Sequence, residues 1–124
     1  MKNILLYIWQ LPQNLLGLLV ILFSRAHTYK HMIWWTEYHF GVSLGRYIIL
    51  NSTSDVTSVR HEWGHQKQSL YLGWLYLLII GLPSAVGNLY DRIAHKEWSY
   101  DDRINWYYNQ PWEKWADKLG GVER

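Results

Sequence analysis

Two long stretches without a charged side chain constrain most strongly how this chain can fold. Residues 3–24 and residues 68–90 contain no Asp, Glu, Lys or Arg. At 22 and 23 positions, each stretch is long enough for one helix to cross the hydrocarbon layer of a bilayer. One basic residue precedes the first stretch and no small-residue cleavage site follows it, so a cleaved secretory signal is not predicted.

Helix-breaking residues interrupt both stretches. Pro12 lies inside the first, and Gly81 and Pro83 divide the second. We therefore expect an apolar helix over residues 4–23, which is an uncleaved membrane anchor, a buried helical hairpin or a helix packed against the second stretch. In the second stretch we expect a helical hairpin that turns at residues 81–84.

Composition excludes several classes of function. The length of 124 residues suits a single domain over residues 1–124. Twelve basic and ten acidic residues are interspersed and give a net charge of +2, which is a poor footprint for binding nucleic acid. Without cysteine there is no disulfide, thiolate metal site or thiol nucleophile, so any metal ligands must come from His, Asp and Glu.

Aromatic residues suggest where the protein is found. The chain has nine Trp and ten Tyr but only two Phe. Trp and Tyr combine an apolar ring with a polar tip, which suits them to the headgroup level of a membrane. We expect membrane association, with a cytoplasmic location as the alternative.

The middle of the chain combines strand signals with helix signals. Residues 31–40 and 44–50 are rich in Trp, Tyr, Ile and Thr and are punctuated by glycine, which predicts two short strands or a hairpin. The polar run 51–55 then offers several N-caps for a long helix over residues 54–80. A last helix is expected to begin at Pro111 and to end at the glycine pair 120–121.

The long predicted helix carries the sequence HEWGH at residues 61–65. In H-E-x-x-H, His61 and His65 lie one helical turn apart and can share a metal ion, while Glu62 can act as general base. Such a site needs a third ligand. Glu97 and Glu113 are the acidic candidates, each followed four residues later by Asp101 or Asp117, and His95 is a further alternative.

The run Glu113-Lys-Trp-Ala-Asp117 resembles the E-x-x-A-D signature of the membrane gluzincins, the CAAX prenyl protease and its bacterial heat-shock relatives. Those enzymes are longer, so the chain resembles a minimal version of them. The resemblance implies Zn²⁺ as cofactor, Glu113 as third ligand, and Asp117 as the residue that orients His61 or His65. It also implies that residues 41–50 form an edge strand that binds a peptide substrate.

Other groups could stabilise the oxyanion that forms during hydrolysis. Tyr107 and Tyr108 precede the Glu113 helix and carry phenol donors. Arg46 and Arg60 could serve the same role or bind a substrate carboxylate, and nothing in the sequence selects among the four.

A metal site also restricts the topology. If residues 68–90 crossed a membrane once, the two histidines and Glu113 would lie on opposite sides of it. The metal hypothesis therefore predicts that this stretch turns back and does not span.

We thus predict a mainly helical α+β fold, zincin-like, with a small sheet, an HExxH helix, a helical hairpin and a third-ligand helix. The predicted function is a membrane-associated zinc metallopeptidase acting on a peptide or protein. Two alternatives remain: a small membrane-associated interaction protein without catalysis, and a non-catalytic zinc-binding relative. The sequence does not indicate the oligomeric state.

Overall fold

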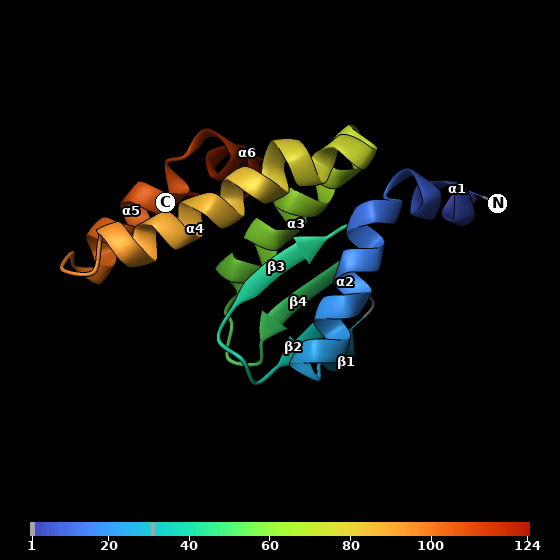
Figure 1. The fold of residues 1–124 in the computed structure, drawn as a ribbon, viewed down its shortest axis with the longest axis horizontal. Coiled ribbons are helices and arrows are strands. Elements are labelled where there is room, and N and C mark those ends of the chain that lie inside the picture. Colours follow the sequence, from blue (N-terminus) through green and yellow to red (C-terminus); the bar gives the residue numbers. More distant parts are fainter. Residues whose placement is uncertain (1, 31) are drawn as a thin grey trace.

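A computed structural model describes residues 2–30 and 32–124 of the chain. It is an α+β fold, mainly helical, as predicted (Figure 1). The elements in chain order are α1 Lys2–Trp9, α2 Leu11–Ser24, β1 His27–Lys30, β2 Ile33–Thr36, β3 Gly41–Leu44, β4 Tyr47–Asn51, α3 Val56–Leu72, α4 Leu82–Ala94, α5 Tyr100–Tyr108 and α6 Pro111–Gly120.

The sheet is small and mixed, with strand order β1-β2-β4-β3. β1 pairs with β2 and β3 with β4 in antiparallel fashion, while β2 and β4 run parallel. The predicted strand over 31–40 is shorter in the structure, and His31 lies outside the described residues. Residues 44–50 contain β4 together with the turn that joins it to β3, and β1 was not predicted.

Helices cover both faces of β4. Successive side chains of a strand point to opposite faces, and Ile48, Ile49 and Leu50 are all buried. α2 packs on one face, where Gly17 lies against Leu44 and Tyr47. α3 packs on the other face, as Figure 1 shows.

The apolar segment predicted over residues 4–23 is divided into two helices, α1 and α2. α1 and α2 meet at an angle of 87°. Pro12 lies at the start of α2, and buried amides hold the helix in place: Gln13 Nε2 donates to Ser69 Oγ and to the Gly73 carbonyl, each at 2.8 Å. The side chain of Asn14 donates to the Tyr7 carbonyl of α1 at 2.9 Å.

The predicted turn at residues 81–84 is also wrong. The chain bends by 118° between Leu75 and Leu77, after a 3-10 turn over Gly73–Leu75. Gly73 has a φ of 56°, and the Trp9 indole packs where any side chain would stand, 2.4 Å from an ideal Cβ. A π-helical segment, Leu77–Gly81, then leads into α4, and Pro83 is accommodated at the start of that helix.

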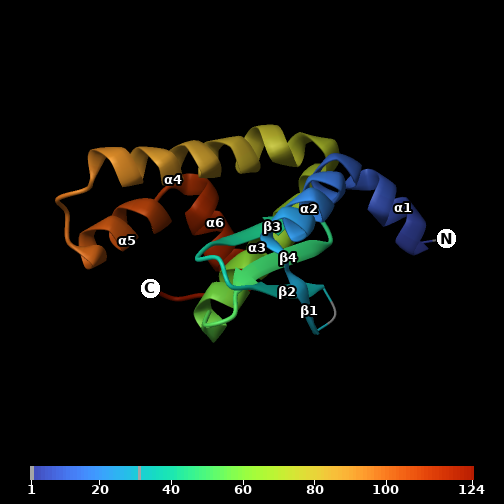
Figure 2. The ribbon, with the colours of Figure 1, turned by 60° about the horizontal axis from the view of Figure 1, so that its bottom comes forward.

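The hairpin itself exists, with its corner earlier in the chain than expected. Figure 2 shows α4 running back above α5 and α6, so that α6 reaches α3. In the part of the chain that the structure describes, no one helix has the length and apolar character to cross a membrane; each of two bent helix pairs, residues 3–24 and 56–94, meets that criterion by length and composition only.

Candidate metal centre

α3 carries both histidines on one face. Asp55 caps the helix by accepting a hydrogen bond from the Ser58 amide at 2.9 Å. His61 and His65 follow one turn apart, both buried, with ring centroids 4.6 Å apart. The helical spacing thus produces the pair of imidazoles that the HEWGH sequence predicted.

α6 brings the carboxylates to these histidines. Pro111 begins the helix, and Glu113 and Asp117 lie one turn apart and are buried. The close approach of α6 to α3 depends on Gly64, because an ideal Cβ there would lie 1.7 Å from the Ala116 carbonyl oxygen. Only a residue without a side chain fits between the two backbones.

Three donor atoms converge between the helices. The Nε2 atoms of His61 and His65 lie 3.2 and 2.8 Å from the same oxygen, Oε1 of Glu113. One possible ligand atom from each residue lies within 4.8 Å of the others, so the cluster could hold a metal ion. Among residues 2–30 and 32–124 this is the one group with that property.

Hydrogen bonds behind the imidazoles favour metal ligation. His61 Nδ1 lies 2.7 Å from Asp117 Oδ1, and His65 Nδ1 lies 2.7 Å from Gln68 Oε1. The Gln68 amide is oriented by its Nε2, which donates to the Trp112 carbonyl at 2.9 Å, so its oxygen faces His65. With both Nδ1 atoms donating to these oxygens, a neutral imidazole presents the lone pair of Nε2 to the centre, as a metal requires.

Charge within the cluster is strongly coupled. Burial would raise the pKa of Glu113, but hydrogen bonds to His61 and His65 outweigh it and hold that pKa well below its usual range. Burial would lower the pKa of His61, but the carboxylates of Asp117 and Glu113 raise it to about 9. Without a metal, the site therefore retains a proton on His61 at neutral pH, and a bound cation would replace that positive charge.

Glu62 is buried beside the centre without a full set of partners. Its Oε1 lies 3.4 Å from the position of a Cβ on Gly41, and its buried Oε2 has no hydrogen-bond partner among the described residues. Burial raises the pKa of the Glu62 carboxyl, and this effect outweighs the imidazoles of His65 and His61, which lower that pKa. A carboxylate in this state is well suited to accept a proton from a reacting group.

Two cavities meet at Glu62 and Tyr107. One, of about 620 Å³, lies between α2, β3 and α4 and has mainly apolar walls that include His65. The other, of about 320 Å³, is polar and lies beside His61. The centre thus opens on a cleft with one apolar arm and one polar arm, and β3, an outer strand of the sheet, borders it.

The predicted tyrosines have different surroundings. Tyr107 lines both cavities, and its hydroxyl lies 3.1 Å from Ser84 Oγ, which donates to Glu113 Oε2 at 2.5 Å. Tyr108 packs edge-on against the His61 ring, with centroids 4.9 Å apart. Burial raises the pKa of Tyr107 well above its usual value and that of Tyr108 to about 12, so both phenols stay protonated.

The alternative ligands lie outside the cluster. Glu97 and Asp101 are exposed near the start of α5. His95 is buried at the end of α4, where its Nδ1 lies 2.9 Å from Asp91 Oδ1. Neither Arg46 nor Arg60 lines the two cavities, and both are exposed.

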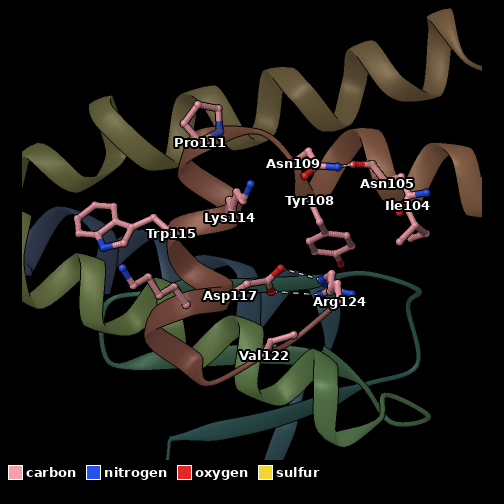
Figure 3. Close-up of a pocket in the computed structure, with 11 residues that line it drawn as sticks. Ile104, Asn105, Tyr108, Asn109, Pro111, Lys114, Trp115, Asp117, Val122 and Arg124 are labelled. Carbon is pink, nitrogen blue, oxygen red and sulfur yellow. Dashed lines mark hydrogen bonds and ion pairs between the residues drawn. The ribbon is translucent and has the colours of Figure 1, made fainter.

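Sequence reasoning missed three residues that support the ligands: Gln68, Ser84 and Arg124. Gln68 follows His65 by three positions on the same helix, and that spacing could have indicated the contact. Ser84 and Arg124 are brought in by other segments, and no local pattern points to them. Arg124 bonds to Asp117, as Figure 3 shows.

Comparison with known proteins adds no relative. No family model, curated protein or solved structure matches the chain.

Proposed function

We propose that the chain is a zinc-dependent metallopeptidase that hydrolyses peptide bonds at a membrane surface. The convergence of His61, His65 and Glu113 beside the partly unpartnered carboxylate of Glu62 carries this proposal. Two imidazoles and one carboxylate are the protein ligands of many catalytic zinc sites, which keep a fourth position open. Zn²⁺ held there supplies Lewis acidity that makes water nucleophilic at neutral pH and polarises a carbonyl.

Glu62 is the proposed general base. It takes a proton from the attacking water and passes it to the leaving amine. Burial raises its pKa, which makes the carboxylate a stronger proton acceptor. Tyr107 keeps its phenol proton and is the better placed of the two tyrosines to donate to a developing oxyanion, since it lines both arms of the cleft.

An extended peptide along β3 would place its backbone beside the reacting groups. β3 pairs with β4 on one side only, and Gly41 lies next to Glu62. A strand added to a free sheet edge is bound through main-chain hydrogen bonds. The substrate side chains would then enter the apolar and polar arms.

Metal analysis tests the site before any substrate is known. The wild-type protein is expected to contain about one zinc per chain, lost in His61→Ala and Glu113→Ala. Glu62→Gln should keep the zinc but lose hydrolysis of a mixed peptide library. Hydrolysis unchanged in Glu62→Gln would contradict the proposed role, whereas a wild type that binds zinc without any hydrolysis would favour the non-catalytic relative.

Exposed apolar side chains support the membrane part of the proposal. Monomers in water seldom expose apolar patches above a few hundred Å². Reciprocal hydrogen bonds join the two apolar segments: Trp9 Nε1 donates to the Leu70 carbonyl, and Trp74 Nε1 to the Ile8 carbonyl. Large apolar side chains exposed on α1, on α2 and from Leu75 to the end of α4 include Ile4, Leu5, Leu15, Leu19, Leu22, Phe23, Leu75, Leu78, Leu82, Val86, Leu89 and Ile93.

Vesicle flotation tests the membrane proposal separately. The wild-type protein should float with phosphatidylcholine vesicles, and Leu22→Asp with Phe23→Asp should reduce the floating fraction. Protein that stays at the bottom of the gradient with vesicles present would contradict membrane binding and would leave the metal proposal untouched.

A further inference from the structure

Asp117 and Tyr108, which both contact His61, are themselves held by Arg124. The guanidinium of Arg124 forks onto Asp117: Nε donates to Oδ2 at 2.7 Å and Nη2 donates to Oδ1 at 3.2 Å (Figure 3). The same guanidinium lies over the ring of Tyr108, with Cζ 3.5 Å from the ring centroid. Arg124 thus contacts two residues that themselves contact His61.

These contacts close into a ring of four side chains. His61 bonds to Asp117 through Nδ1 at 2.7 Å, Asp117 to Arg124, Arg124 stacks on Tyr108, and Tyr108 packs edge-on against the His61 imidazole at 87°. The imidazole is therefore held at its Nδ1 by a carboxylate and along its ring by a phenol. Arg124 is the residue that joins these two supports.

The forked ion pair fixes the orientation of the Asp117 carboxylate as well as its distance from Arg124. Both carboxylate oxygens of Asp117 are engaged by Arg124, so the carboxylate plane cannot rotate without breaking one of the two bonds. That plane determines where Oδ1 lies relative to His61 Nδ1. Residues behind a ligand histidine set its orientation in this way, and their loss commonly weakens metal binding by about 10- to 100-fold.

We infer that Arg124 is a positioning residue of the metal centre, which aims Nε2 of His61 at the metal through Asp117 and Tyr108. The inference rests on the proposed metal site but requires no hydrolytic activity. Lysine cannot replace arginine fully in this role, because an ammonium group neither forks onto a carboxylate nor stacks flat on a ring.

Zinc affinity measured by competition with a chelating dye tests the inference. Arg124→Gln should bind zinc about tenfold more weakly than wild type, with a smaller loss in Arg124→Lys. Lys118→Gln is the matched control, because Lys118 lines a surface pocket together with Asp117 and Arg124 and forms no ion pair with Asp117 in the described structure. It should bind zinc as the wild type does.

Two further measurements separate positioning from general stabilisation. In an Asp117→Asn background, Arg124→Gln should change zinc affinity less than twofold, since its main route to His61 is already altered. The visible spectrum of the cobalt-loaded protein should shift in Arg124→Gln and remain unchanged in Lys118→Gln. Urea unfolding of metal-free Arg124→Gln and Lys118→Gln shows whether one of these two variants has lost its fold.

The outcomes distinguish this inference from the proposed function. Zinc affinity within twofold of wild type in Arg124→Gln would overturn the inference while leaving the metal site intact. An equal loss of affinity with and without Asp117→Asn would also overturn it, because Arg124 would then act independently of Asp117. A wild-type chain that binds no zinc would instead refute the proposed function.

Discussion

Gly64→Ala tests the packing that brings the residues of the candidate metal centre together. Gly64 lies in α3 between the two histidines, facing α6. A Cβ at this position would stand 1.7 Å from the Ala116 carbonyl oxygen and 2.5 Å from its carbon, both rigid backbone atoms. Since contacts below 3.0 Å essentially never occur, α3 and α6 must separate by about 1.3 Å, the difference between 3.0 and 1.7 Å.

A shift of this size acts on both stability and the site. Overpacking of a tight contact costs about 1–3 kcal/mol, and a backbone clash lies at the upper end, so we expect Gly64→Ala to lower the free energy of unfolding by about 3 kcal/mol. The same movement carries Glu113 away from His61 and His65. In the wild-type structure their Nε2 atoms lie 3.2 and 2.8 Å from Glu113 Oε1. Zinc bonds to oxygen at about 2.0–2.2 Å, so zinc affinity should fall at least tenfold.

Gly87→Ala is the matched control. Gly87 lies inside α4, and no atom lies within 4 Å of its ideal Cβ. Alanine is favoured over glycine inside helices by about 0.5–1 kcal/mol, so this variant should be slightly more stable than wild type. Urea unfolding with chelator present and a zinc competition titration measure both effects. If Gly64→Ala matched Gly87→Ala in both assays, the close packing of α3 on α6 would be refuted.

Three further predictions concern the groups around the ligands. Gln68→Leu should weaken zinc binding about tenfold in a competition titration, because His65 Nδ1 loses its acceptor. Ser84→Ala should weaken zinc binding severalfold by calorimetry, because Glu113 Oε2 loses its donor. In metal-free protein the pKa of His61 is about 9, against 6.5 unfolded, because carboxylates outweigh burial. The contribution of His61 to stability is therefore fully present below pH 6.5, is on the order of 3 kcal/mol, and disappears as the pH rises through about 9. Unfolding with chelator at pH 6 and pH 9.5 measures it; equal stability at both values would contradict the assigned contacts.

Local patterns predicted the parts of the site that depend on one helix. His61 and His65 share a face because a helix repeats every 3.6 residues, and Asp55 caps that helix through its own side chain. Glu113 and Asp117 follow the same rule in α6. The structure brings the two histidines and the two carboxylates together. Their roles in metal binding and catalysis stay predictions.

Long-range contacts explain what the sequence did not reveal. The bend was expected at Gly81 and Pro83, since both residues break helices. It occurs between Leu75 and Leu77, directly after the turn that begins at Gly73, where Trp9, distant in sequence, packs against that glycine and Gln13 bonds to its carbonyl. No pattern within residues 68–90 contains that information.

The polar residues that interrupt the first apolar stretch hold its helices in place through hydrogen bonds. Gln10, Gln13 and Asn14 resemble defects in a spanning helix, yet all three are buried. Ser69 Oγ donates to Gln10 Oε1 at 2.6 Å and accepts a hydrogen bond from Gln13 Nε2. Side-chain amides therefore hold α2 against α3. The apolar side chains of α2 are consequently turned outward.

This arrangement links the metal centre to the exposed apolar surface. Among the described residues, the buried side chains comprise seven apolar and seventeen polar or charged ones, so directional hydrogen bonds specify much of the interior. Such bonds fix orientation more narrowly than apolar packing does, which a ligand cluster such as His61, His65 and Glu113 requires. With the interior occupied by polar contacts, most leucines and isoleucines of α1, α2 and α4 have no place inside and lie on the surface. One sequence pattern thus accounts for both the rigid centre and the outward apolar face.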